Sequence, residues 1–268
     1  MNFTPVQTAD FDGIHAMRSQ LYKLFTAPID GMWEALYIPA STSYMIQEGQ
    51  HALGYCCIDD DHSLTQLFMK KGAEYRARKV VQELISLNMI LSAKLSSIEP
   101  ITFNACLSLS MSNSPHTFCY QYNGNSKVGT ISSPLAPVLS NDIVLVKDFL
   151  KDQVGFEDNF GYTENLVNCG EIYAIQDGPE IIATGECRLS DTQENTADIG
   201  MIVNRSHQGK GLGAEVLHQL AQKACALKRM PICSTTRENI PSQKSIEKAG
   251  FYCSHIIFDI KFTRPHEN

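Results

Sequence analysis

Residues Val203 to Gly213 read V-N-R-S-H-Q-G-K-G-L-G and form the segment of the chain best suited to chemistry. An apolar stretch at 199–203 precedes the segment, and a helical pattern at 214–227 follows it. Three glycines in the segment remove side chains where backbone N–H groups could converge on an anion. The positive end of the helix dipole would add to this attraction. The segment therefore predicts a turn that holds a phosphate or diphosphate.

Three kinds of glycine turn compete for this segment. A P-loop requires G-x-x-x-x-G-K-[ST], and the chain contains no such run. A dinucleotide-binding turn requires G-x-G-x-x-G and a carboxylate about 20 residues further on. This chain has G-x-G-x-G instead, and the following strand, expected at 231–236, ends without that carboxylate. The third pattern is [Q/R]-x-x-G-x-[G/A] after a strand that ends in Val, and residues 208–213 fit it at every constrained position.

Through this third pattern the chain resembles the Gcn5-related N-acetyltransferase (GNAT) family, whose turn binds the diphosphate of coenzyme A. A second segment, Asn239 to Phe251, matches the family signature N-x-x-[SA]-x-x-x-x-x-K-x-G-F. Asn239 is expected to cap a helix, Pro241 suits the first turn of that helix, and Gly250 suits its C-terminal cap. Both motifs lie within 196–251, in the family's order and with a strand between them.

Composition and charge narrow the possible functions. A net charge of −7 over 268 residues argues against nucleic-acid binding and suits a cationic amine substrate. No apolar run is long enough to span a membrane, and residues 1–5 do not resemble a signal peptide. The nine cysteines include no C-x-x-C pair, which favours free thiols and a cytoplasmic location. The eight histidines lack metal-ligand spacing, so we expect no metal.

The second half of the chain reads as one α/β domain. Its pattern predicts a helix at 142–153 and three antiparallel strands at 172–175, 180–190 and 196–203. The glycine-turn helix, a strand at 231–236, the second motif's helix and a strand at 252–262 follow. This is the element order of the GNAT fold. We expect an α/β (α+β) fold with a mixed, mostly antiparallel sheet flanked by helices.

The first half shows a similar order, which favours a tandem arrangement of two GNAT-like domains. The pattern predicts a helix at 11–25, strands at 51–59 and 64–69, a long helix at 75–95 and a strand at 101–108. Gly54 and Pro100 stand 131 residues before Gly185 and Pro231, which suggests an internal repeat. Two unrelated α/β domains are the alternative. The expected domains are 1–125 and 141–268, joined by a Gly-, Ser- and Pro-rich linker at 126–140.

The first copy of the suggested repeat lacks the glycines of the turn. Ala77, Arg78, Val80 and Gln82 stand where the second half has Gln208, Gly209, Gly211 and Gly213. Side chains at these positions would keep a diphosphate away from the backbone. The sequence therefore predicts that residues 1–125 form a degenerate domain that does not bind coenzyme A and that shapes the acceptor site or supports its partner.

The resemblance implies acetyl-CoA, or another acyl-CoA, as co-substrate and assigns residues to it. The diphosphate would lie against the turn, and the pantetheine arm would pair with the backbone of the preceding strand. An opening between that strand and 231–236 would make room for the arm, and a backbone N–H near Ile202 would polarise the thioester oxygen. The expected cofactor-binding residues are Met201, Val203, Gln208, Gly209, Lys210, Gly211, Leu212, Gly213, Asn239 and Ser242.

A proton acceptor for the attacking ammonium is harder to identify. Asp198 and Glu186 lie on the central strands and are the candidate bases, although each could equally be an ion-paired surface carboxylate. The family often has Tyr, as a general acid, where this chain has Ile246, and some members have a catalytic Glu where it has Ser234. Cys233 has no evident His partner and is expected to be a buried thiol.

The sequence thus predicts an N-acetyltransferase that moves an acyl group from acyl-CoA to a primary amine by direct attack. The acceptor would be a small amine or the amine of a peptide or protein. The alternative is a non-catalytic acyl-CoA-binding regulator or interaction protein, which the changes at Ile246 and Ser234 permit. The sequence does not name the acceptor, the acyl length or the oligomeric state.

Overall fold

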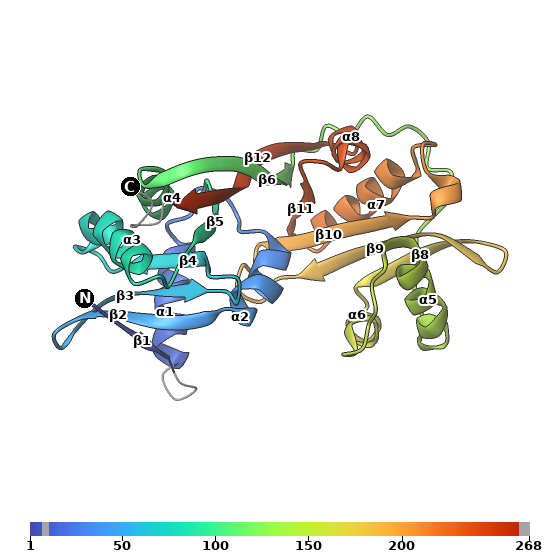
Figure 1. Cartoon of the computed structure of the whole chain (residues 1–268). Coiled ribbons are helices and arrows are strands. Elements are labelled where there is room, and N and C mark those ends of the chain that lie inside the picture. The colour runs from blue at the N-terminus through green and yellow to red at the C-terminus, as the bar shows by residue number, and fades with distance from the viewer. Residues whose placement is uncertain (7–10, 263–268) are drawn as a thin grey trace. The chain divides into compact units, whose positions relative to one another are not determined.

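The computed structural model describes residues 1–6 and 11–262 of the chain. They form two compact units (Figure 1). Unit 1 consists of residues 1–6, 11–118 and 255–262, and unit 2 consists of residues 119–254. The division differs from the expected domain bounds in three places. Residues 119–125, expected in the first domain, belong to unit 2. Residues 255–262 belong to unit 1 rather than to the second unit, and the expected linker, 126–140, lies entirely within unit 2.

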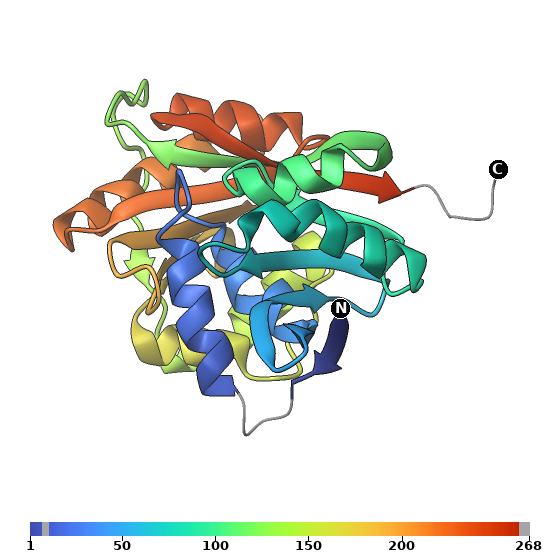
Figure 2. The same cartoon turned by 90° about the vertical axis from the view of Figure 1, so that its left-hand side faces the viewer.

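Unit 1 is a sheet with helices on its two faces, seen from two sides in Figures 1 and 2. Its strands are β1 (Asn2–Pro5), β2 (Thr42–Glu48), β3 (His51–Ile58), β4 (Ser63–Met69), β5 (Ser92–Ser96) and the parts of β6 (Ser110–Tyr122) and β12 (Phe251–Phe262) that fall in the unit. Its helices are α1 (Phe11–Tyr22), η2 (Trp33–Tyr37), α2 (Ile38–Ala40), η3 (Glu74–Arg76), α3 (Ala77–Ser86) and α4 (Pro100–Leu107). Five strands and the end of β12 follow the order β1-β2-β3-β4-β5-β12, and only the β4–β5 pair is parallel.

Alternation along β3 supplies both faces of this sheet. Cys56 and Ile58 join the apolar core formed with Val80 and Leu84 of α3. Tyr55 and Cys57 point to the opposite face, as expected for neighbouring residues of a strand. On that face Arg18 of α1 donates a hydrogen bond to Gln66 on β4 at 3.3 Å. Because successive side chains of β3 point to opposite faces of the sheet, α3 packs on one face and α1 on the other.

Two expectations for the first half are wrong. The long helix predicted at 75–95 ends at Ser86, because Asn88 takes a left-handed conformation (φ 54°) that redirects the chain into β5. The strand predicted at 101–108 is helix α4, which starts at Pro100, where the fixed φ of proline suits a first helical turn. Pro231 lies in strand β11 (Met230–Thr236), so its match with Pro100 does not join equivalent elements.

Unit 2 follows the predicted element order except for one helix, Tyr162–Cys169, which the sequence did not predict. Its strands are the end of β6, β7 (Ala136–Pro137), β8 (Ile172–Asp177), β9 (Glu180–Leu189), β10 (Thr196–Val203), β11 and the start of β12. Its helices are η4 (Ser140–Asp142), α5 (Ile143–Val154), α6 (Tyr162–Cys169), η5 (Arg205–His207), α7 (Leu212–Ala226) and α8 (Ile240–Lys248). The strand order is β6-β11-β10-β9-β8-β7. The antiparallel β8-β9-β10 meander and the mostly antiparallel sheet flanked by helices are confirmed.

Helix α7 lies unusually close to the sheet of unit 2. A Cβ atom on Gly185 of β9 would lie 2.9 Å from both Leu220 and Val216 of α7, so glycine permits this approach. On an adjacent face of α7, Ser132 donates two hydrogen bonds to Glu215, and Gln219 bonds the backbone at Ser133 and Leu135. The segment expected to be a linker is therefore ordered and fixes α7. None of the helices in the described part of the chain is long and apolar enough to cross a membrane.

Candidate active site

The glycine turn links β10 to α7 as the sequence predicts. Asn204 caps the short helix η5 by accepting a hydrogen bond from the Ser206 N–H at 3.0 Å. Gly209 and Gly211 then adopt left-handed conformations, with φ of 74° and 90°. Gly211 caps α7 without a side-chain hydrogen bond. The first N–H groups of α7 therefore remain available to an external acceptor.

The strands on either side of the turn separate. β10 and β11 pair in parallel only at their beginnings, where Thr196, Ala197 and Asp198 stand opposite 230–232. β10 continues to Val203 and β11 to Thr236 without further pairing. The opening expected between these strands is thus present, and it leaves one edge of β10 without a strand partner from residue 199 onward.

The register of β10 decides which backbone groups face this opening. The Asn204 N–H donates to the Ile182 carbonyl at 2.9 Å, and Ile202 stands opposite Thr184 of β9. Amide directions alternate along a strand, so the N–H and C=O of Ile202 also point to β9. Those of Met201 and Val203 point to the opening. In agreement, the Val203 carbonyl accepts a hydrogen bond from the Gln208 side chain at 3.1 Å.

The second motif forms helix α8 on the other side of the opening. The Asn239 side chain accepts from the Ser242 N–H at 3.2 Å, which confirms the predicted cap. Gly250, just after the helix, has φ of 101°, and a Cβ there would lie 2.8 Å from the Ser126 nitrogen. Glycine is therefore required at 250 for the chain to leave α8 beneath the 123–128 loop.

The turn, the open edge and α8 enclose one cleft in unit 2 with a volume of about 680 Å³. Nine of the ten expected cofactor-binding residues line the cleft, and so does Ile202: Met201, Val203, Gln208, Gly209, Gly211, Leu212, Gly213, Asn239 and Ser242. Lys210 does not line it, because its ammonium donates to the Ser206 carbonyl at 3.3 Å. The cleft wall also includes residues that the motif comparison did not select: Gln153, Val154, His207, Ala214, Ile240, Pro241, Lys244, Ser245 and Lys248.

Contacts around two glycines show how tight the cleft is. A Cβ on Gly213 would lie 3.1 Å from the Met201 methyl carbon and 3.4 Å from the Ser245 hydroxyl. A Cβ on Gly211 would lie 3.3 Å from the Lys248 ammonium. Side chains at either position would occupy the space above the turn, so the cleft depends on both glycines.

The candidate bases lie in a charged network that does not line the cleft. Arg188 of β9 bonds Asp198 and lies 3.6 Å from Glu186. The Tyr162 hydroxyl of α6 donates to Glu186 at 2.7 Å and accepts from Arg188 at 3.1 Å. Asp198 is buried, whereas the Glu186 side chain is 16% exposed. Glu186 stands opposite Gly200, and the position that a Cβ on Gly200 would occupy is surrounded by open space.

Tyr162 was missed by the sequence reasoning, and a capped turn holds it in place. Asp158 accepts hydrogen bonds from the backbone of Tyr162 at 2.9 Å and Thr163 at 2.7 Å, and Lys147 pairs with the same carboxylate. Burial and the neighbouring Glu186 raise the pKa of Tyr162. The phenol therefore stays protonated and remains a hydrogen-bond donor near neutral pH.

Positions where the family often carries an acid hold none here. Ile246 is 2% exposed and packs in the core, and Ser234 is half-buried on β11. Cys233 is buried, as expected. Among residues 1–6 and 11–262, no group of three or more His, Cys, Asp or Glu side chains is placed to hold a metal ion.

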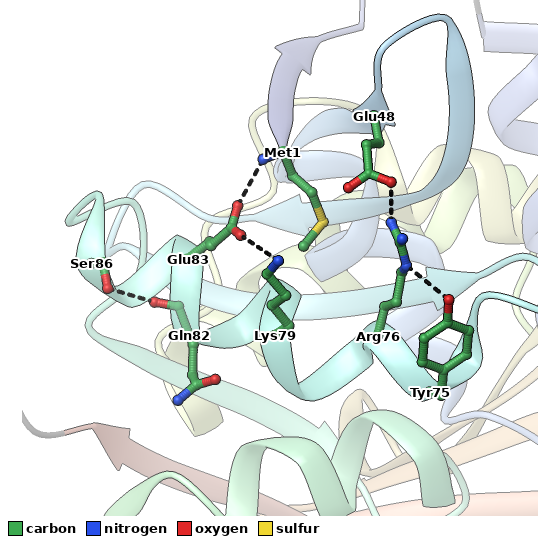
Figure 3. Close-up of polar contacts among 8 residues, drawn as sticks. All are labelled: Met1, Glu48, Tyr75, Arg76, Lys79, Gln82, Glu83 and Ser86. Atoms are coloured by element: carbon green, nitrogen blue, oxygen red, sulfur yellow. Dashed lines mark hydrogen bonds and ion pairs between the residues drawn. The ribbon is translucent and has the colours of Figure 1, made fainter.

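Unit 1 has a different arrangement at the corresponding helix start (Figure 3). Arg78, Val80 and Gln82 were expected to stand against the three glycines, but they lie inside α3, which begins at Ala77, so that expectation is wrong. The counterpart of the glycine turn is the segment 70–76 between β4 and α3. The preceding turn carries Arg76, which pairs with Glu48 and bonds the Tyr75 hydroxyl. Further along α3, Glu83 pairs with the Met1 ammonium at 3.0 Å (Figure 3). Side chains and ion pairs thus occupy the region where unit 2 exposes backbone.

Comparison with family models identifies the fold of both halves. A model described as "Acetyltransferase (GNAT) family" matches residues 144–251, and one described as "Acetyltransferase (GNAT) domain" matches residues 10–123. Together the two matches cover most of the chain. The chain belongs to the GNAT family. The predicted internal repeat is therefore a tandem of two GNAT domains, and the alternative of two unrelated domains is excluded.

Solved structures show the same fold over the full length. An acetyltransferase of the GNAT family from Colwellia psychrerythraea has a TM-score of 0.93 at 24% identity, covering 98% of this chain and all of its own. A GCN5-related N-acetyltransferase from Sphaerobacter thermophilus has a TM-score of 0.63 at 12% identity, covering 98% of this chain and 96% of its own. A tandem GNAT protein from the clavulanic acid biosynthesis pathway has a TM-score of 0.62 at 14% identity, with 99% of each chain covered. A comparison with curated proteins gave no match.

Proposed function

We propose that this protein transfers an acyl group, most simply acetyl, from acyl-CoA to a primary amine. One observation carries the proposal: the glycine turn, the open edge of β10 and helix α8 line a single cleft of about 680 Å³ in unit 2. This volume falls in the ordinary range for small-molecule sites, roughly 300–1,000 Å³. Acyl-CoA supplies an acyl group activated as a thioester.

The residues of the cleft fit the two ends of such a carrier. Uncapped N–H groups at the start of α7 suit a diphosphate, because Gly209 and Gly211 leave the backbone bare. The free edge at Met201 and Val203 suits the amide groups of a pantetheine arm, which would bond β10 as an added strand does. Asn239 and Ser242 face the arm from α8.

We assign the oxyanion donor to the Met201 N–H instead of the Ile202 N–H expected from the sequence. The register with β9 turns the Ile202 amide away from the opening, whereas the Met201 amide faces it. A backbone donor fixed in a strand needs no reorganisation when negative charge develops on the thioester oxygen.

Glu186 is the better candidate for the base. Asp198 is buried and bonded to Arg188, so it serves to hold that guanidinium. Glu186 is partly exposed and faces the open space over Gly200, where an ammonium could approach it. The Tyr162 hydroxyl orients the Glu186 carboxylate. In this scheme Glu186 removes a proton from the amine, and water protonates the departing thiolate because Ile246 cannot.

The acceptor is then a small amine or the amine of a peptide or protein. The net charge of −7 favours a cationic substrate over nucleic acid. We further propose that unit 1 does not bind the carrier, since Arg76, paired with Glu48, lies just before α3, where unit 2 has the glycine turn before α7. We place the protein in the cytoplasm on the grounds that all nine cysteines are free thiols.

The test incubates the protein with acetyl-CoA and a panel of primary amines. The reaction is monitored by measuring the CoA thiol that is released. The wild-type protein should release thiol only when a suitable amine is present. Glu186→Gln should lower kcat about 10²- to 10⁴-fold, with acetyl-CoA affinity unchanged. A Glu186→Gln variant as active as the wild type would remove Glu186 from the mechanism.

A non-catalytic acyl-CoA-binding protein is the second candidate. Two observations favour it: Ile246 is buried in place of an acid, and neither Glu186 nor Asp198 lines the cleft. The same assay separates the two functions. Tight binding of acetyl-CoA without acylation of any amine would support the binding protein and contradict the enzyme.

A further inference from the structure

Unit 1 contains the same kind of opening between parallel strands as unit 2. β4 pairs with β5 only at residues 63 and 64, just as β10 pairs with β11 only at residues 196–198. β4 then continues through 65–69, and β10 continues through 199–203. The two strands therefore extend equally far past the last residue that pairs with their parallel neighbour. In unit 2 this free edge is the one that suits the arm of the carrier.

In unit 1, two side chains of the same unit occupy the edge. The hydroxyl of Thr102 in α4 donates a hydrogen bond to the Leu67 carbonyl of β4 at 2.9 Å. The indole N–H of Trp33 in η2 donates to the Thr65 carbonyl of β4 at 3.4 Å. Thr102 is 4% exposed and Trp33 is 5% exposed, so both side chains lie inside the unit. The two carbonyls that face away from β3 thus have donors from the chain itself.

The start of the following helix shows the same contrast between the units. Glu99 stands immediately before α4, as Asn239 stands before α8. Thr102 follows three residues later, as Ser242 does in unit 2. Asn239 and Ser242 line the open cleft. Glu99, in contrast, is 4% exposed, as Thr102 is, and burial raises the pKa of its carboxyl group to about 8. Positions that form a cleft wall in unit 2 are therefore interior positions in unit 1.

The indole of Trp33 is held firmly over this edge. The Trp33 backbone N–H donates to the Asp30 carboxylate at 2.9 Å, and the indole stacks on the Tyr37 ring with centroids 4.7 Å apart. Just after these residues, the Ser41 hydroxyl lies 2.9 Å from the Thr65 hydroxyl of β4. Contacts on both sides of η2 thus fix the ring against the strand.

We propose that Trp33 and Thr102 determine which unit accepts the carrier, because they close the opening of unit 1 from within. The inference rests on the proposed function and deepens it. An arm that pairs with a strand edge needs the carbonyls of that edge as acceptors. In unit 1 the two side chains already bond those carbonyls and fill the space beside them. This closure is separate from the one at Arg76, which stands before α3 in place of a glycine turn.

The experiment opens unit 1 and measures whether it then binds an arm. Trp33→Ala/Thr102→Ala removes both donors and leaves a cavity beside β4, and buried cavities of this kind admit small ligands. Leu84→Ala is the matched control, because it creates a cavity of its own in the core between α3 and the sheet. Calorimetry measures the binding of pantetheine, which is the arm without a diphosphate, while excess acetyl-CoA fills unit 2. The double variant should bind pantetheine roughly 10-fold or more tightly than the wild type and Leu84→Ala do, because two backbone acceptors are freed.

Fluorescence tests the same inference without any substitution. Trp33 is the only tryptophan of the chain, so indole emission reports on the opening of unit 1. Addition of pantetheine to the wild type saturated with acetyl-CoA should leave this emission constant. A saturable change would show that the unsubstituted unit 1 admits an arm and would overturn the inference. This measurement decides the question even where the double variant does not fold.

Two calorimetric results would overturn the inference while leaving the proposed function intact. One is a folded double variant that binds pantetheine no better than the wild type does. The other is an equal gain in Leu84→Ala, which would mean that any cavity in unit 1 suffices. A wild-type protein that does not bind acetyl-CoA would overturn the proposed function, and the inference with it.

Discussion

Replacing Gly211 with alanine separates what the glycine turn does for folding from what it does for binding. Gly211 has φ of 90°, a conformation that costs an L-residue about 1–2 kcal/mol. Alanine also restricts the unfolded chain, which returns about 0.4–1 kcal/mol. The expected net loss of stability is therefore about 1 kcal/mol. The added methyl would also meet Lys248 at 3.3 Å, but a flexible ammonium can move away.

The effect on binding should be larger than the effect on stability. A Cβ at 211 projects over the N–H groups at the start of α7 and displaces Lys248 from the same place. Losing one charge-assisted hydrogen bond costs about 1.5–3 kcal/mol, or roughly 10- to 100-fold in affinity. Gly211→Ala should weaken acetyl-CoA binding by that factor.

Gly178→Ala provides the matched control. Gly178 lies in the β8–β9 turn with φ of 59°, and a Cβ there would meet nothing within 4 Å. Its substitution should cost similar stability in urea unfolding and leave acetyl-CoA affinity at the wild-type value in calorimetry. Equal affinities for the wild type and Gly211→Ala, with both variants folded, would refute the reasoning that backbone at 211 contacts the carrier.

Three further predictions concern stability. Burial raises the pKa of Glu99 to about 8 from 4.5, so its contribution to stability is complete below pH 4.5 and is lost as the pH rises to 8. The free energy of unfolding should therefore fall with pH in this range, and Glu99→Gln should remove up to about 1.4 kcal/mol per pH unit of that dependence. Urea titrations at several pH values measure it, and an unchanged pH dependence in Glu99→Gln would contradict the prediction. In Gly250→Ala the new Cβ would lie 2.8 Å from the Ser126 nitrogen, and alanine would have to adopt φ of 101°. The free energy of unfolding should fall by about 2 kcal/mol or more. A melting temperature equal to that of the wild type would contradict the packing of the 123–128 loop against Gly250. Arg188→Met leaves the buried Asp198 without its guanidinium and should cost about 3–5 kcal/mol, most of which Arg188→Met/Asp198→Asn should recover in chemical unfolding.

Most residues that line the cleft could be selected from the sequence because their signals are local. Positive φ at Gly209 and Gly211 and the cap at Asn239 depend on residues within a few positions of one another. Such turn and cap chemistry can be recognised without knowledge of the fold. For the same reason most elements from 142 to 262 were predicted with small errors at their ends, whereas helix α6 was not predicted.

The errors arose where a distant contact decides the outcome. Residues 92–96 become a strand because β4 and β12 pair with them, and β12 lies more than 150 positions later in the chain. The direction of the Ile202 amide depends on the register with β9, which no local pattern fixes. Helix α6 brings Tyr162 to Glu186, and α8 brings the Lys248 ammonium close to Gly211, so only the folded arrangement reveals these neighbours.

A crystal structure of the protein with acetyl-CoA tests the central claim most directly. We expect one carrier per chain, with its diphosphate against the backbone of 208–213 in unit 2 and its arm along Met201 and Val203. A carrier bound only in unit 1, or a diphosphate that makes no contact with the backbone of 208–213, would contradict the account.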